Sequence, residues 1–165
     1  MHDTFTGHDH AGCITQALAR AEDTCQAAGA RLTPLRRRVL EILLREHRAM
    51  GAYDVLKELV REGHGAQPPV AYRALDFLVE QGLAHRIERL NAFIACSQAG
   101  PDGRAGHAPV FLICRACGAV AEAQWQPQKG ALGRAARAAG FRIDEVVSEA
   151  LGLCPACQGA QEAAP

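Results

Sequence analysis

Two Cys-x-x-Cys pairs in the last third of this 165-residue chain have the spacing of metal ligands: residues 114–117 read Cys-Arg-Ala-Cys, and residues 154–157 read Cys-Pro-Ala-Cys. Two intervening residues let both sulfurs of a pair turn toward one ion, and four thiolates are a usual tetrahedral zinc set. Disulfides and a thiol redox pair are the alternatives for the same spacing. We predict a closed structural zinc site with the ligands Cys114, Cys117, Cys154 and Cys157.

The composition restricts where such a protein works. Seven cysteines is an odd number, and a reducing compartment keeps thiols available for metal. No apolar run approaches the ~18 residues needed to span a membrane, and the first dozen residues are polar, unlike a signal peptide. We therefore expect a cytoplasmic protein with no membrane partner, built from two small modules that a zinc ion helps to hold together.

The charge balance gives only one local hint of nucleic-acid binding. Eighteen basic residues are matched by eighteen acidic ones, so the net charge is zero. Between residues 31 and 48, however, arginines outnumber the two acids Glu41 and Glu46. A solvated helix face is the alternative explanation for this basic run, which consists of Arg31, Arg36, Arg37, Arg38, Arg45 and Arg48.

Apolar periodicity and turn residues predict four helices in the first half of the chain. A polar tail over 1–12, expected to be disordered, precedes helices over 13–28, 34–46, 52–62 and 68–81. Thr33-Pro34 supplies an N-cap hydroxyl and a first-turn proline for the second helix. Alternation over 83–87 and 92–95 then predicts a hairpin. Helices followed by a two-stranded wing are typical of the winged helix-turn-helix, whose last helix before the wing enters the DNA major groove.

The helix over 68–81 is the predicted recognition helix. A helical wheel centred on Leu75 buries Ala71, Leu78 and Val79, and directs Arg73 outward with Tyr72 on the flank. Phe77 falls away from that centre, which predicts a second packing contact. A half-buried core aromatic is the alternative role for Tyr72.

The second half of the chain predicts a small module that mixes strands and one helix. Strands are expected over 110–113, 118–124 and 141–148, and an Ala-rich helix over 128–139. A Gly- and Pro-rich hinge over 97–109 separates this dimerisation and metal-binding domain, 110–165, from the winged-helix domain, 13–96. An open sheet edge would be available to a second copy, so we expect a homodimer and an α+β fold class.

These segments resemble the ferric uptake regulator family of bacteria, and most closely its zinc uptake regulator branch. The resemblance covers residues 31–157 and rests on the following segments: Arg-Leu-Thr-Pro at 31–34 with Arg36, Ala-Tyr-Asp at 52–54, Pro-Pro-Val-Ala-Tyr-Arg-Ala-Leu-Asp-Phe-Leu at 68–78, and the two cysteine pairs with their flanks.

The resemblance implies DNA contacts from the recognition helix. Family members usually have Thr-Val-Tyr-Arg where residues 70–73 read Val-Ala-Tyr-Arg, so a phosphate-binding hydroxyl is missing at Val70. Tyr72 and Arg73 are kept. A tyrosine ring can pack on a thymine methyl, and an arginine fork fits guanine O6 and N7. Arg36, within the segments that carry the resemblance, is assigned to DNA with them.

The resemblance also implies a second, sensory zinc site, making two zinc ions per protomer. The positions that match the branch's ligands are His85, Cys96, His107 and Glu122. Two imidazoles, a thiolate and a carboxylate form a sensible tetrahedral zinc set. The soft sulfur favours zinc over iron(II) or manganese(II), and residues 100–109 hold only one of the histidines that iron sensors cluster there.

The implied function is a zinc-dependent repressor of zinc uptake genes that binds operator DNA as a homodimer, with no small-molecule substrate. A repressor of the same family that senses iron, manganese, nickel or peroxide is the alternative. A zinc hydrolase is disfavoured because a catalytic zinc needs an open ligand position and both predicted sets are filled by four protein ligands. A thiol oxidoreductase is disfavoured because its Cys-x-x-Cys would start a helix after a strand within a thioredoxin-like order of elements, which this chain does not show.

Overall fold

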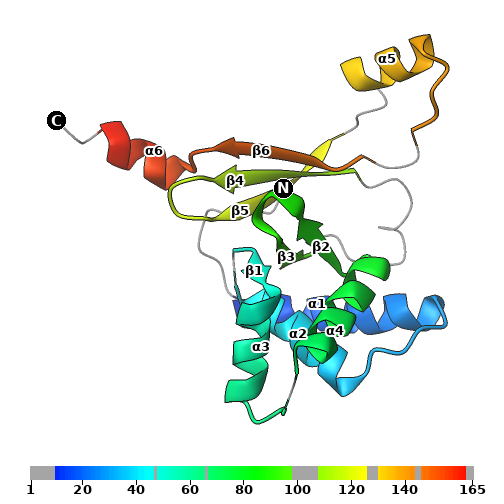
Figure 1. The fold of residues 1–165 in the computed structure, drawn as a ribbon, viewed down its shortest axis with the longest axis vertical. Coiled ribbons are helices and arrows are strands. Elements are labelled where there is room, and N and C mark those ends of the chain that lie inside the picture. The colour runs from blue at the N-terminus through cyan, green and yellow to red at the C-terminus, as the bar shows by residue number, and fades with distance from the viewer. Residues whose placement is uncertain are drawn as a thin grey trace.

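The computed structural model describes residues 10–46, 48–65, 67–97, 108–125, 130–143 and 146–162 (Figure 1). Its helices are α1 His10–Ala27, α2 Pro34–Arg45, α3 Ala52–Arg61, α4 Pro68–Glu80, the 3-10 turn η1 Glu88–Leu90, α5 Ala131–Ala138 and α6 Pro155–Glu162. Its strands are β1 Met50–Gly51, β2 Ala84–Ile87, β3 Ala92–Ala95, β4 Ala108–Cys114, β5 Val120–Trp125 and β6 Ser148–Gly152.

Four helices build the N-terminal module, as the sequence predicts. Thr33 caps α2, since its hydroxyl oxygen accepts a hydrogen bond from the Arg36 amide at 3.4 Å, and Pro34 occupies the first turn. The apolar faces of the helices meet in one core, whose most buried members include Val39, Leu43, Val55, Leu59, Leu75 and Leu78. The first helix starts at His10, so residues 10–12 lie in α1 and only residues 1–9 of the predicted tail lie outside the described residues.

The wing has three strands, one more than predicted. β2 and β3 form the expected antiparallel hairpin, and Asn91, in the left-handed conformation with φ 45°, closes it after η1. The short strand β1 pairs with the far side of β3, Met50 opposite Phe93. A two-residue strand is too short to produce an alternating pattern, which is why the sequence did not reveal it.

The C-terminal sheet has the order β5-β4-β6, with β4 antiparallel to β5 and parallel to β6. The predicted strand over 141–148 is wrong: residues 141–143 have no regular structure, Phe141 is 67% exposed, and the strand runs over Ser148–Gly152. The helix α6 was not predicted. Parallel pairing sets Gly152 beside Cys114, and this register brings the second cysteine pair next to the first.

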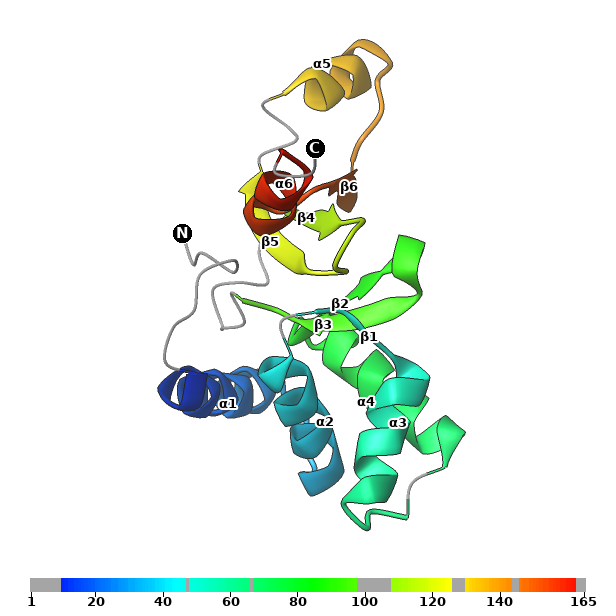
Figure 2. The same ribbon diagram turned by 90° about the vertical axis from the view of Figure 1, so that its left-hand side faces the viewer.

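The wing and the C-terminal sheet share a small apolar core. Ile87 and Ile94 of the wing pack with Phe111, Ile113 and Val120 of the second sheet. Figure 2 shows β2 and β3 lying against β4 and β5, whereas α5 projects away from the rest of the chain. Of the predicted hinge over 97–109, residues 98–107 lie outside the described residues.

The helices that the structure describes include none long and apolar enough to cross a membrane.

Candidate metal centres and nucleic-acid interface

The two cysteine pairs meet at one end of the C-terminal sheet. Cys114 ends β4, Gly118 with φ 75° turns the chain back toward β5, and the second pair straddles the start of α6. The four sulfurs lie within 4.8 Å of one another. The Sγ atoms of Cys117 and Cys154 are 3.7 Å apart, far beyond a disulfide bond but close to the ~3.8 Å edge of a tetrahedron with zinc–sulfur bonds of about 2.3 Å.

The thiols of this cluster cannot all ionise by themselves. Backbone amides of Cys117 and Cys154 lower the pKa of Cys114 to about 6, and the Cys154 amide is 3.3 Å from the Cys114 sulfur. The thiol of Cys154, with those of Cys117 and Cys114, raises the pKa of Cys157 to about 12. A divalent cation would remove this mutual repulsion, so the donor chemistry fits a zinc ion bound to four thiolates.

A second cluster forms where the two modules meet. His85 comes from β2, Cys96 directly follows β3, and Glu122 lies on β5. One ligand atom from each lies within 4.8 Å of the others. Nitrogen, sulfur and carboxylate oxygen at this spacing fit a zinc ion that is short of one ligand. The fourth predicted ligand, His107, lies outside the described residues.

The environment of this cluster holds its side chains in place. Glu122 accepts a hydrogen bond from the Ser97 amide at 2.9 Å, and its carboxylate oxygen is 3.4 Å from Nε2 of His85. Burial disfavours the charged imidazole, yet hydrogen bonding to Cys96 and Glu122 outweighs it and raises the pKa of His85. Burial likewise opposes the Glu122 charge, but His85 and the Ser97 amide lower the pKa of that carboxyl. The ring of Phe111 packs against His85, with centroids 5.2 Å apart.

Neither Ser97 nor Phe111 was named from the sequence as part of this cluster. Their roles depend on a backbone amide and on strand register, which leave no residue-type signal. A tetrahedral zinc site needs such supporting contacts to orient its ligands.

The predicted recognition helix α4 presents two of the expected DNA-contacting side chains to solvent. Tyr72 is 41% exposed and Arg73 is exposed. The helical wheel placed Val79 wrongly, since Val79 is 36% exposed, whereas Phe77 is 9% exposed within the helical core and so has packing contacts beyond the face centred on Leu75, as the sequence predicts. The buried face is therefore centred between Ala74 and Leu78, because packing against α2 and α3 covers both flanks.

Arg36 is engaged within the protein. Its Nη1 donates to the carbonyl of Arg31 at 2.7 Å, and its guanidinium carbon lies 3.6 Å from the centroid of the Phe77 ring. Through this cation-π contact, α2 supplies part of the second packing contact that the sequence predicts for Phe77.

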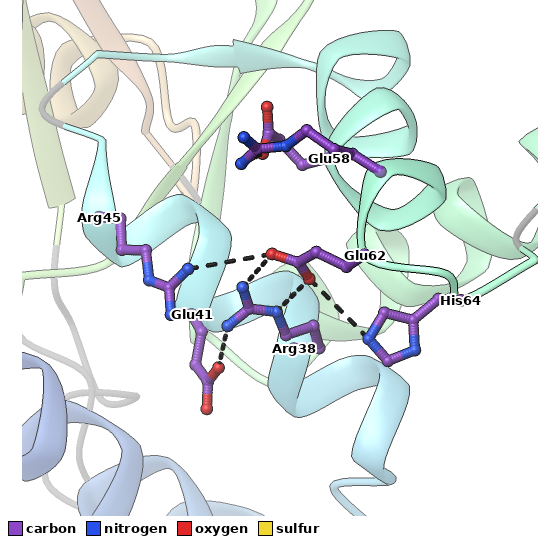
Figure 3. A network of polar contacts seen from close by, with 7 residues as sticks. Arg38, Glu41, Arg45, Glu58, Glu62 and His64 are labelled. Atoms are coloured by element: carbon purple, nitrogen blue, oxygen red, sulfur yellow. Dashed lines mark hydrogen bonds and ion pairs between the residues drawn. The ribbon is translucent and has the colours of Figure 1, made fainter.

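Much of the basic run is paired with acids. The guanidinium of Arg38 bonds both Glu41 and Glu62, and Arg45 lies 3.9 Å from Glu62 (Figure 3). Arg37 pairs with Glu22 of α1, and Arg48 lies 3.2 Å from Glu46. Glu22 and Glu62, acids outside α2, thus pair with three arginines of that helix. The alternative of a solvated helix face fits Arg37 and Arg45, whose side chains are 40% and 54% exposed, but not Arg38, which is 16% exposed.

Comparison with known proteins places these features in a family. A model of the ferric uptake regulator family matches residues 27–149. The zinc uptake regulation protein of Escherichia coli K12 is 39% identical over 143 residues, which cover 86% of this chain and 81% of that protein, and that of Shigella flexneri matches equally.

Two solved structures are similar over almost their whole length. A zinc uptake regulator complexed with zinc and DNA aligns with a TM-score of 0.82 at 36% identity, covering 90% of this chain and 97% of that chain. Holo XcZur aligns with a TM-score of 0.76 at 35% identity, covering 88% and 99%. With its winged helix, four-cysteine cluster and matching family model, this chain belongs to the ferric uptake regulator family.

Proposed function

We propose that this chain is a zinc-responsive transcriptional repressor that binds operator DNA as a zinc-loaded homodimer and represses zinc uptake genes. The observation that carries the proposal is the cluster of His85, Cys96 and Glu122 at the junction of the two modules. The relatives support it, since curated zinc uptake regulation proteins are 39% identical and a zinc uptake regulator bound to zinc and DNA has the same fold.

The proposed sensor works because its ligands come from both modules. His85 and Cys96 belong to the wing, Glu122 belongs to the C-terminal sheet, and His107 is the proposed fourth ligand. When bound, zinc supplies the attraction that holds these donors at one point. Moving a two-state equilibrium from 1:99 to 99:1 requires about 5.5 kcal/mol of differential binding, within the roughly 10–16 kcal/mol of structural zinc sites.

The two proposed zinc ions have different roles, because their ligands come from different parts of the chain. The four cysteines belong to one module and join its β4–β5 turn to the start of α6, so their proposed ion stabilises the fold. The mixed set joins two modules, so its proposed ion sets their relative orientation. This gives two zinc ions per protomer.

In this proposal, specific recognition of an operator requires two copies of the chain. Tyr72 and Arg73 of each α4 would contact one half-site, and binding would be tight only when the spacing of the two helices matches the operator. An apolar groove of about 330 Å³ supports the proposed homodimer, because residues of β4, β6 and the start of α6 line it, among them Leu112, Ala150 and Leu151. A second copy would cover them. A protein that binds chromosomal DNA acts in the bacterial cytoplasm, so we propose that location for this chain.

A metal analysis combined with DNA binding tests the proposal. Zinc-loaded protein would be used to select duplexes from a random-sequence pool, and the recovered duplex would be titrated at buffered free zinc. We expect two zinc ions per chain, a pseudo-palindromic duplex and an affinity that rises steeply with zinc. Iron(II) or manganese(II) in place of zinc should not restore the affinity.

The variant Cys96→Ser isolates the sensor. It should keep the four-cysteine zinc and the fold but bind the selected duplex weakly at every zinc concentration. Cys13→Ser is the matched control, because Cys13 is an exposed thiol on α1 outside both clusters. If the Cys96→Ser protein and the parent respond to zinc alike, the sensory assignment is wrong.

A further inference from the structure

One row of residues crosses the C-terminal sheet and faces the wing. Phe111 on the central strand β4 is paired with Glu122 on β5 and with Glu149 on β6. Residues opposite one another on adjacent strands direct their side chains to the same face. Phe111 is fully buried against Ile87 and Ile94 of the wing, so this face is the one that contacts the DNA-binding module.

Both carboxylates of the row reach the wing, but at different places. Glu122 contacts His85 and the Ser97 amide, at the end of the wing where the mixed metal cluster lies. Glu149 accepts hydrogen bonds from the backbone amides of Glu88 and Arg89, at 2.7 and 3.2 Å. These two amides begin η1, immediately after β2. A carboxylate that accepts from consecutive amides at the start of a helical turn makes charge-assisted hydrogen bonds.

The two contacts therefore fix the strand β2 at both ends. His85 and Glu88 are three residues apart, which is about 10 Å along an extended strand. The apolar contacts of Ile87 and Ile94 and the isolated bridge between Arg48 and Ala119 also join the two modules, but none of them restrains the start of η1 by a polar contact. The second polar attachment, about 10 Å from the first, supplies that restraint.

We propose that Glu149 is a positioning residue that converts zinc binding into a defined orientation of the DNA-binding module. This inference rests on the proposed function and adds a zinc-independent contact to it. The Glu149 tether, defined as the carboxylate with the amides of Glu88 and Arg89, is present in a conformation that aligns with a TM-score of 0.82 to a regulator bound to zinc and DNA. It therefore belongs to the arrangement that is competent to bind DNA.

If the tether positions the wing, its loss should change the coupling between zinc binding and DNA binding, which the loss of a contact that only stabilises the fold would not do. Coupling between zinc and DNA is reciprocal, so operator DNA must tighten zinc binding by the same factor by which zinc tightens DNA binding. Without the tether, zinc still binds His85, Cys96 and Glu122, but it restrains the wing less. Loss of a hydrogen-bonded contact worth about 1 kcal/mol should lower the coupling factor about fivefold.

The test uses full-length protein and the duplex selected by the zinc-loaded parent. Glu149→Ala should retain two zinc ions per chain and the parent's zinc affinity without DNA, yet bind the duplex about fivefold more weakly when zinc-loaded. DNA should also tighten its zinc binding about fivefold less than in the parent. Asp23→Asn is the charge-matched control, because it removes an exposed carboxylate of α1, far from the tether in sequence.

A second variant removes the donor instead of the acceptor. Glu88→Pro deletes the amide at 2.7 Å, and the chain can accommodate it because Ile87 has the extended φ of −94° and ψ of 102° that precedes proline readily. It should weaken coupling by less than Glu149→Ala does, because the Arg89 amide still donates to Glu149, and the double variant should match Glu149→Ala. This variant keeps the test valid if Glu149→Ala fails to fold.

The outcomes separate the two proposals. If the parent's affinity for the duplex does not depend on zinc, the proposed function is wrong. If the parent responds to zinc, and the variants melt at a lower temperature but keep the full coupling factor, only the proposed role of the tether is wrong.

Discussion

Replacing Phe111 with alanine should weaken the junction between the modules more than any other single truncation in the C-terminal sheet. The side chain is fully buried, packs against the ring of His85 at 5.2 Å and belongs to the apolar core shared with Ile87 and Ile94. It also stands between the two carboxylates that reach the wing. Its removal therefore leaves a cavity under both ends of β2.

The magnitude follows from the area that Phe111 buries. A buried phenylalanine removes on the order of 150–200 Å² from water, and about 25 cal/mol per Å² gives roughly 4 kcal/mol. Measured Phe→Ala changes in protein cores cost a similar 3–5 kcal/mol, with the spread set by how far the site collapses. Phe111→Leu, which fills most of the same space, should cost about 1–1.5 kcal/mol and is the matched control.

Calorimetry and chemical denaturation of the zinc-loaded protein measure this change. We expect Phe111→Ala to lower the free energy of unfolding by about 4 kcal/mol and to reduce zinc-dependent DNA binding, because the wing is no longer held on the sheet. A cost below about 1 kcal/mol would contradict the reasoning, since it would mean that the residue is not part of a common core.

Three further outcomes test other parts of the structure. Cys114→Ser should lose one zinc ion per chain and melt at a lower temperature, whereas Cys13→Ser should not; unchanged metal content would refute the structural role. Arg73→Ala should weaken binding of the selected duplex by about 1–3 kcal/mol and relax sequence preference, and an equal loss on all sequences would indicate a phosphate contact instead. The hydrogen bond from Arg38 lowers the pKa of Glu62, so the stability that this pair contributes is present above the ordinary value of 4.5 and is lost as the pH falls through the lowered pKa. The difference in melting temperature between the parent and Glu62→Gln should accordingly be positive at pH 7 and shrink toward pH 3; a constant difference would contradict the pairing.

The helical half of the fold could be predicted from the sequence because its signals are local. A capping threonine, a first-turn proline and apolar residues at helical spacing placed α2, α3 and α4 within one residue of their observed ends. The strand β6 was misplaced because its residues are half-buried or exposed and show no alternation of apolar and polar side chains. What defines β6 is pairing with β4, whose paired residues lie 38 positions earlier in the chain, and no local pattern reports such pairing.

The two metal clusters also differ in how far a local sequence pattern predicts them. Paired cysteines two residues apart predict their own geometry, and the four sulfurs do converge. His85, Cys96 and Glu122 are separated by 10 and 25 residues, and they meet only because the wing packs on the second sheet. Without the resemblance to a known family, their types and spacing would have indicated a surface residue, a packing residue and a solvated strand residue.

The arrangement of charge agrees with the proposal that two copies bind one operator. Non-specific DNA affinity depends on the number of phosphates that basic side chains neutralise. The net charge here is zero, and the guanidinium groups of Arg37, Arg38, Arg45 and Arg48 all have acidic partners within the chain. The electrostatic contribution of a single module to its affinity for DNA of arbitrary sequence is therefore small. In the proposed complex, affinity comes from base contacts made by two α4 helices at once, and linking two weak contacts gives a large gain only when their spacing fits. A contact that fixes the orientation of each wing consequently contributes to the spacing of the two helices, and so to DNA binding.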